Sequence, residues 1–148
     1  MRIAIASDHA GFHYKELVKN YLLTKGLDVI DFGTASEAPC DYPDFVIPAA
    51  KALRDGQVER AILLGGSGNG EAIAANRIKG VRCCLCLTVE LAKLARMHND
   101  SNAISLGQRI IREDQLIEIV KAWLETSFEG GRHIPRIEKI ESLSLQSL

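Results

Sequence analysis

Apolar and polar positions follow one another along the chain in blocks that predict strands and helices in turn. Short apolar runs, bounded by glycine or charged residues, predict five strands. These strands are expected over residues 2–7, 27–33, 60–66, 81–87 and 102–109. The central run, RAILLGG, is apolar without alternation, which is typical of a strand covered on both faces.

Each predicted strand is followed by a segment whose apolar residues recur at helical spacing. The five helices are expected over about 13–25, 41–56, 69 onward, 88–99 and 113–126. Gly26 should end the first helix, and Thr88 is a suitable N-cap for the fourth. Pro48 lies inside the second helix and is expected to kink or delay it.

Five strand–helix pairs predict an α/β fold, a three-layer, Rossmann-like, doubly wound sheet of five parallel strands. The length of 148 residues fits a single domain, 1–148, with a C-terminal helix or tail over about 132–148. The last residues, SLSLQSL, carry no chemical motif and are expected to be disordered. Ligands of such sheets bind outside the carboxyl ends of the strands, so functional residues are expected there.

Composition excludes some partners. The net charge of −1 provides no general attraction to nucleic acid or to acidic membranes. No apolar run approaches the roughly 20 residues that span a bilayer, and the N-terminal segment is interpreted as a strand rather than a signal peptide. We expect a cytoplasmic protein that binds a small molecule, with neither nucleic acid nor membrane as a partner.

The four cysteines do not predict a metal site. Cys83, Cys84 and Cys86 lack the paired Cys-x2-Cys spacing of zinc sites, and Cys40 stands alone. On a strand, Cys84 and Cys86 would share one face and Cys83 the other. They are interpreted as small buried apolar residues.

A glycine-rich turn, GGSGNG, follows the third predicted strand and precedes Glu71. Glycines let the backbone approach a ligand closely, and the amides of the next helix favour an anion. A P-loop would need Lys at position 71, and a dinucleotide fingerprint starting at Gly66 would need Gly there. The turn therefore indicates an anion site that is not one of these nucleotide motifs.

Glu71 and Ser67 each allow two interpretations. Glu71 could complement the dipole of its helix, or it could act as a general base beside an oxyanion-stabilising turn. Ser67 could bond the loop backbone, or it could donate to the developing oxyanion. The residues alone leave both pairs of alternatives open.

Other polar residues lie near predicted element ends. Asp8 and His9 end the first strand, and His98 with Asn99 ends the fourth helix, where a cationic residue also suits the dipole. The tail holds Arg132 and Arg136 four residues apart, which on a helix gives a phosphate-binding pair or a solvated basic face.

Six ordered motifs together resemble the B-type ribose-5-phosphate isomerases, the family that also contains galactose-6-phosphate isomerase. The motifs are SDHAG at 7–11, DYP at 41–43, GGSGNGEAIAAN at 65–76, RMHND at 96–100, LGQR at 106–109 and GGRHIPR at 130–136. The resemblance covers about residues 2–140. It implies a homodimer or homotetramer in which each active site is built from two subunits.

The resemblance implies interconversion of ribose 5-phosphate and ribulose 5-phosphate, a step of the pentose phosphate pathway, without a metal or other cofactor. The ring-opened sugar loses its C2 proton, an enediolate forms, and the proton returns at C1. His98 and Asp8 would open the ring, and Ser67 with the turn amides would stabilise the enediolate. The substrate-binding residues that the resemblance implies are His9, Tyr42, Gly66, Gly68, Asn69, Gly70, Asn99, Arg109, Arg132, His133 and Arg136.

One position departs from a common family pattern. Many members carry a catalytic cysteine where this chain has Gly65, and a second branch with GGSGNGE uses the glutamate instead. The resemblance therefore implies that Glu71 is the base. Two alternatives are an isomerase of a hexose 6-phosphate, such as allose or galactose 6-phosphate, and a non-catalytic phosphosugar-binding module.

Overall fold

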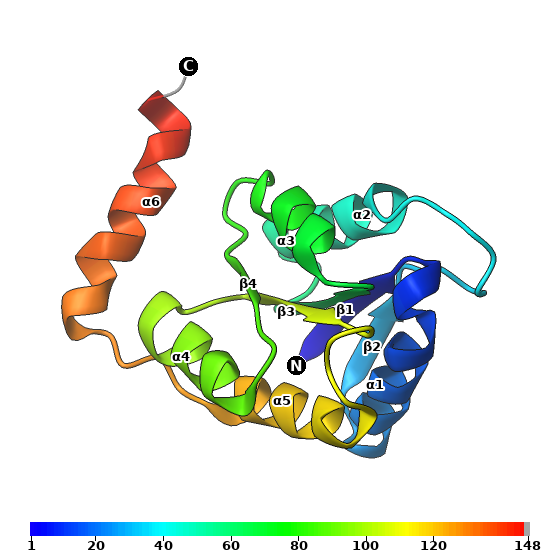
Figure 1. The fold of residues 1–148 in the computed structure, drawn as a ribbon. Coiled ribbons are helices and arrows are strands. Elements are labelled where there is room, and N and C mark those ends of the chain that lie inside the picture. Colours follow the sequence, from blue (N-terminus) through cyan, green and yellow to red (C-terminus); the bar gives the residue numbers. More distant parts are fainter. Residues whose placement is uncertain (147–148) are drawn as a thin grey trace.

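The computed structural model describes residues 1–146 and confirms the expected α/β architecture. Five parallel strands form one sheet in the order β2-β1-β3-β5-β4 (Figure 1). The strands are β1 (Arg2–Ser7), β2 (Asp28–Asp31), β3 (Arg60–Gly65), β4 (Cys83–Leu85) and β5 (Ala103–Gly107). The helices are η1 (His9–Gly11), α1 (Phe12–Thr24), α2 (Pro43–Arg54), α3 (Asn69–Asn76), α4 (Val89–Asn99), α5 (Glu113–Glu125), η2 (Gly131–His133) and α6 (Ile134–Gln146).

Helices cover both faces of the sheet, α1, α4 and α5 on one side and α2 and α3 on the other (Figure 1). Successive residues of a strand point to opposite faces. Ile3 and Ile5 therefore join the core beneath α1, α4 and α5, whereas Ala4 and Ala6 join the core beneath α2 and α3. Both cores are fully closed to solvent at these positions.

Four strands, β2 to β5, are shorter than the apolar runs that predicted them, and β4 differs most. β4 pairs with β5 alone at the edge of the sheet, and it spans Cys83–Leu85 of the predicted 81–87. The expected alternation is confirmed, because Cys83 faces the α2 and α3 core and Cys86 faces the other. The Thr88 N-cap is also confirmed, since its hydroxyl accepts a bond from the Leu91 N–H at 3.1 Å.

The chain leaves β1 toward β2 and then returns to place β3 on the opposite side of β1. Such a switch point opens a crevice at the carboxyl ends of the two strands. Gly11 lets η1 lie directly against the end of β3, since an added Cβ would lie 2.5 Å from the Leu64 carbonyl carbon. The residues that follow β1 and β3 are thereby brought together.

Helix α6 stands away from both helical layers (Figure 1). It is tied to the rest of the chain by an ion pair of 2.6 Å between Arg82 and Glu141. Its apolar residues Ile134, Ile140 and Leu143 are 45%, 54% and 60% exposed. The expectation that the SLSLQSL segment is disordered was wrong for residues up to Gln146, because they continue α6.

Lys15 is a buried charge at the outer edge of the sheet. Its side chain is fully buried, and its Nζ lies 2.7 Å from Asp31 and 2.9 Å from Glu16. Burial would raise the pKa of Asp31, but hydrogen bonds from Lys15 and Lys19 outweigh it and lower that pKa. This pairing fixes α1 against β2. Within residues 1–146 no helix is both long and apolar enough to cross a membrane.

Candidate active site

A cleft of about 230 Å³ lies at the carboxyl ends of β1 and β3. It is lined by Asp8, His9, Ala10, Tyr42, Gly66, Ser67, Gly70, Glu71 and Arg109. All except Ala10 are residues that the sequence had indicated. The remaining turn residues, Gly68 and Asn69, do not line the cleft; Gly68 is the N-cap residue of α3, and Asn69 is its first residue.

The glycine-rich turn is held by the end of β5. Gln108 donates its backbone N–H to the Gly65 carbonyl at 2.8 Å, and Arg109 donates to the Gly66 carbonyl at 2.9 Å. The Ser105 hydroxyl donates to the Gly68 carbonyl at 2.7 Å. Gly68 has φ +85°, a conformation that glycine adopts without strain. The turn is therefore a fixed scaffold rather than a loose loop.

Glu71 lies in the first turn of α3, and its side chain points back over the end of β3. It is 3% exposed. A Cβ added at Gly65 would overlap the Glu71 carboxylate, whose atoms are the three nearest heavy atoms. The position of this carboxylate thus depends on residue 65 having no side chain.

Burial raises the pKa of Glu71 and is the largest influence on it. The backbone N–H of Glu71 lowers the pKa, and the nearby charge of Asp8 raises it, with a net upward shift. A helix N-terminus favours an ionised carboxylate, but here desolvation outweighs that effect. A raised pKa makes Glu71 a stronger base than an exposed glutamate.

Hydrogen-bond donors also lie at the end of the cleft that holds Glu71. The exposed Ser67 accepts a bond from the Asn69 N–H at 3.2 Å through its Oγ, so its own O–H is available to a ligand. The first amides of α3 have no acceptor within the helix. Both features suit a negatively charged oxygen placed above the turn.

Asp8 and His9 enter the cleft from β1. The buried Asp8 caps η1, accepting a bond from the Gly11 N–H at 3.1 Å. The backbone of Cys40 contacts Nδ1 of His9 with its N–H at 3.1 Å and its carbonyl oxygen at 3.2 Å. Nε2 of His9 is therefore the nitrogen available to a ligand.

Tyr42 and Arg109 close the sides of the cleft. The Tyr42 ring lies over Gly70, where an added Cβ would be 2.5 Å from Cζ. The Arg109 guanidinium lies against Gly66, with Nη1 3.2 Å from an added Cβ. Gly66 and Gly70 therefore leave room for the side chains of Arg109 and Tyr42, in addition to presenting their backbone amides.

The remaining indicated residues lie elsewhere in the chain. His98 and Asn99 end α4, close to the start of β5, while Arg132, His133 and Arg136 follow in η2 and α6. The Asn99 carbonyl accepts a bond from Arg82 Nε at 3.1 Å, just before β4. Strands rise about 3.3 Å per residue, so the length of β3 alone puts roughly 16 Å between these residues and Glu71.

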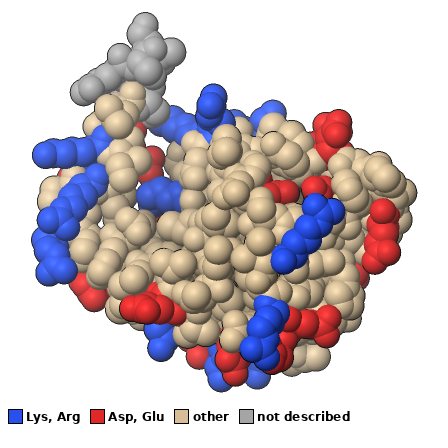
Figure 2. Space-filling model, in the orientation of Figure 1, with Lys and Arg blue, Asp and Glu red and all other residues tan. Residues whose placement is uncertain are grey.

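The second group forms a basic surface of its own. Arg132, Arg136 and Lys139 are exposed, and Lys and Arg side chains gather along α6 and the turn before it (Figure 2). The indicated residues thus fall into two separate groups. One is the cleft with Glu71, and the other, defined by His98, Asn99, Arg132, His133 and Arg136, is the histidine–arginine half-site.

Comparisons with known proteins identify the family of this chain. Residues 3–140 match the family described as Ribose/Galactose Isomerase. The structure of Clostridium thermocellum ribose-5-phosphate isomerase B is 39% identical, with a TM-score of 0.98 and 100% of each chain covered. The Mycoplasma genitalium ribose-5-phosphate isomerase B, solved with bound ribulose-5-phosphate, is 38% identical, with a TM-score of 0.93 and 98% and 97% coverage.

A further relative is named for a different substrate. The D-erythrulose-4-phosphate isomerase of Pectobacterium atrosepticum is 40% identical over 142 residues, with 95% of this chain and 93% of that protein covered. The chain belongs to the ribose/galactose isomerase family of sugar phosphate isomerases.

Sequence reasoning missed the residues that position the site. Gly11, Ser105 and Gln108 hold the cleft together through backbone contacts that only the folded sheet reveals. It also missed Glu129, which lies beside His98 and His133. The four-residue spacing from Glu129 to His133 was the one available signal.

The raised pKa of Glu71 predicts a stability cost at neutral pH. A carboxyl whose pKa is higher in the folded state stabilises the fold when protonated, and this contribution is lost as pH rises through the folded pKa. Glu71→Gln should therefore raise Tm at pH 7–8, by on the order of 2–4 °C for each kcal/mol recovered. Thermal denaturation at pH 4 should show a much smaller difference. A lower Tm for the variant at both pH values would contradict this assignment.

Proposed function

We propose that this protein interconverts ribose 5-phosphate and ribulose 5-phosphate, with Glu71 as the general base. The observation that carries the proposal is the buried Glu71 carboxylate, which has a raised pKa and lies in a cleft beside Ser67 and the amides of a glycine-rich turn. Removing a proton next to a carbonyl requires both a base and stabilisation of the resulting enediolate.

In the proposed reaction, Glu71 takes the C2 proton of the open-chain aldose, exchanges it with water, and donates a proton to C1. A second proton moves from O2 to O1, so that the C2 hydroxyl becomes the ketone and the aldehyde becomes a hydroxyl. The Ser67 hydroxyl and the turn amides stabilise the enediolate oxygens. Removing one such donor typically costs about 3 kcal/mol of transition-state stabilisation.

Gly65 supports glutamate rather than cysteine as the base. The Glu71 carboxylate fills the space into which a side chain at position 65 would project. Burial raises the pKa of Cys83 and Cys84, and it raises that of Cys86 to about 12, so these thiols are poor nucleophiles and bases. Cys40 contributes its backbone to His9.

We further propose that two copies of the chain complete each site. The cleft of about 230 Å³ is small beside the roughly 300–1,000 Å³ of typical ligand pockets. His98 and the arginines lie at the opposite end of the sheet from Glu71, and α6 exposes apolar side chains away from the body of the chain. A second copy that brought its histidine–arginine half-site over the cleft would account for both features.

In that assembly, Asp8 of one copy and His98 of the other open the sugar ring. His9 grips the phosphate together with Arg132 and Arg136 of the second copy, while Arg109 and His133 assist. Paired guanidiniums suit phosphate because each can donate two hydrogen bonds. Asn99 binds a sugar hydroxyl, and Tyr42 lines the sugar site.

Activity assays with several sugar phosphates distinguish ribose 5-phosphate from the other candidate substrates. The relative that acts on a four-carbon sugar phosphate makes D-erythrulose 4-phosphate a second candidate, and hexose 6-phosphates are a third. Turnover of ribose 5-phosphate should exceed that of the others in kcat/KM. A non-catalytic phosphosugar-binding module would bind these compounds without turning them over.

The base assignment predicts the fate of an isotopic label. Ribose 5-phosphate deuterated at C2 should lose its label to water with the native enzyme, whereas Glu71→Gln should slow both exchange and isomerisation by about 10²–10⁴-fold. Mass spectrometry of the sugar phosphate measures both. The matched control is Glu113→Gln, which removes an exposed first-turn glutamate from α5 and should leave the rates unchanged. Label loss at the native rate in Glu71→Gln would show that another group is the base.

The shared-site proposal predicts complementation between two inactive variants. Glu71→Gln and His98→Asn should each be inactive alone. Coexpressed copies that pair at random should recover about a quarter of native activity, because half of the dimers are mixed and each of these has one intact site. Gel filtration of the mixture checks that dimers form. No recovery from a verified mixed dimer would contradict a site built from two copies.

A further inference from the structure

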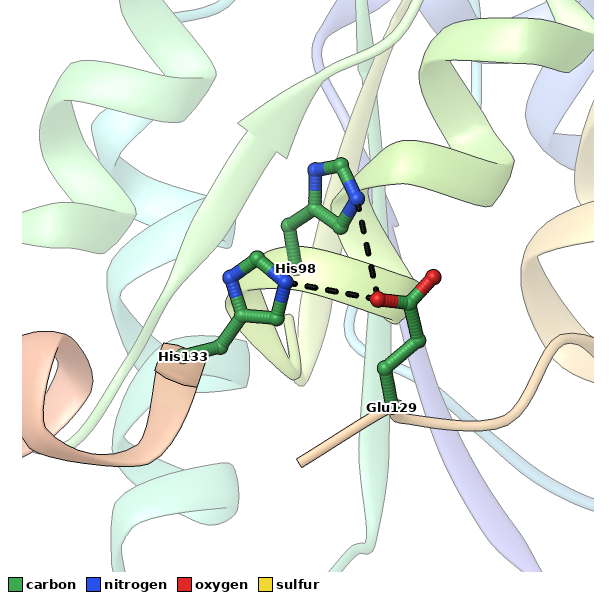
Figure 3. Close-up of side chains that lie close together, drawn as sticks. All are labelled: His98, Glu129 and His133. Atoms are coloured by element: carbon green, nitrogen blue, oxygen red, sulfur yellow. Dashed lines mark ion pairs between the residues drawn. The ribbon is translucent and has the colours of Figure 1, made fainter. Parts of the chain in front are cut away.

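Two histidines and a glutamate from separate segments meet in the histidine–arginine half-site (Figure 3). His98 comes from the last turn of α4, Glu129 from the segment after α5, and His133 from η2. Nε2 of His133 lies 3.4 Å from Oε2 of Glu129, and Nε2 of His98 lies 4.0 Å from the same oxygen. Among the described residues this is the one group of three such side chains whose ligand atoms all lie within 4.8 Å of one another.

The backbone holds this group in place. Glu129 donates its N–H to the Met97 carbonyl at 3.1 Å, which fixes it beside the end of α4. Gly130 and Gly131, both at positive φ, turn the chain back so that His133 stacks on His98. The ring centroids are 4.5 Å apart and the rings are 17° from parallel. The cluster is therefore built by the fold rather than by chance contact of mobile side chains.

His133 provides a second and independent indication of a ligand. The residue is 5% exposed, and its Nε2 is buried without a hydrogen-bond partner among the described residues. A buried polar atom without a hydrogen bond is unfavourable, and the 3.4 Å ion pair with Glu129 does not supply one. That nitrogen points toward Glu129, so a ligand at the centre of the group would satisfy it (Figure 3).

We propose that His98, Glu129 and His133 bind a divalent transition-metal ion of the zinc type. Two imidazole nitrogens and one carboxylate oxygen suit Zn²⁺, whereas Mg²⁺ prefers oxygen ligands alone. In a tetrahedral site with zinc–ligand distances near 2.0–2.1 Å, the ligand atoms lie about 3.4 Å apart. The Glu129–His133 pair already has this separation, and Nε2 of the partly exposed His98 lies 4.0 Å from the same carboxylate oxygen.

The group leaves one coordination position open. The side chains of His98 and Glu129 are 36% and 46% exposed, so water can supply the fourth ligand from the solvent side. The Glu129 carboxylate offsets one of the two charges of the ion. Because both histidines must be neutral to bind it, the ion competes with protons and binds more tightly as pH rises.

The ion would be an inhibitor rather than a cofactor. This consequence, unlike the binding itself, rests on the proposed function, in which His98 exchanges protons with the sugar. A metal on Nε2 of His98 removes that nitrogen from ring opening. A reaction that needs no metal would then be slowed by micromolar zinc, and a chelator would restore it.

Metal binding is tested on the full-length protein by calorimetric titration with Zn²⁺ and by the visible spectrum of bound Co²⁺. We expect binding of one ion per chain, no binding of Mg²⁺, and affinity at least about tenfold weaker in Glu129→Gln. The matched control, Glu125→Gln, removes an exposed glutamate at the end of α5 and should bind as the native protein does.

Several results would contradict the proposed metal site. These are no binding of Zn²⁺, equal affinity in Glu129→Gln and Glu125→Gln, or a Co²⁺ spectrum dominated by thiolate ligation, which would move the ion to the cysteines. Isomerase assays with added Zn²⁺ test the inhibition, and Glu129→Gln should need at least about tenfold more zinc for half-inhibition. Bound zinc without inhibition would refute that consequence alone. Absence of any isomerase activity would refute the proposed function while the binding data still decided the metal site.

Discussion

The arrangement of this site depends on one steric constraint, the absence of a side chain at Gly65. The Glu71 carboxylate occupies the space that a Cβ there would need, and this places a nearly buried carboxylate at the end of β3. Backbone bonds from Gln108 and Arg109, which directly follow β5, to Gly65 and Gly66 hold the turn in place. The same constraint places the carboxylate beside the free amides at the start of α3, because both belong to the segment that directly follows β3.

Burial and the helix N-terminus act on Glu71 in opposite directions, and burial prevails. The raised pKa means that burial disfavours the ionised form of this carboxylate. Such a cost is typical of functional positions and suits a group that must accept a proton. Lys15 is a contrasting case. Its buried charge is compensated by ion pairs with Asp31 and Glu16, which hold α1 against β2.

Much of the fold could be predicted from the sequence, because apolar periodicity reports directly on burial. The order of strands and helices, the Thr88 cap and the alternation of Cys83 with Cys86 all followed from local patterns. Strand ends could not be predicted, since β4 ends where its one neighbour stops pairing. The segment to Gln146 was expected to be disordered, because the sequence did not show that α6 would continue through it.

The candidate site, too, could be predicted only in part from the sequence. Residues that follow strand ends, such as Asp8 and Glu71, could be placed at one edge of the sheet from topology alone. The separation of His98 from Glu71 could not, because it depends on the direction of α4, and the buried Lys15 and the partner Glu129 depend on contacts between distant segments. Resemblance supplied roles for His98 and Glu71, but only the fold shows that these two residues lie far apart within one chain.

The most direct test of the constraint at Gly65 is a double-mutant cycle for folding stability. Gly65→Ala, Glu71→Ala and the double variant are compared with the native protein by urea denaturation. If the carboxylate fills the space above Gly65, adding a methyl group there should cost about 1–3 kcal/mol in the native background and much less when Glu71 is alanine. Equal costs in the two backgrounds would show that Glu71 does not lie over Gly65, and the account of the site given above would be wrong.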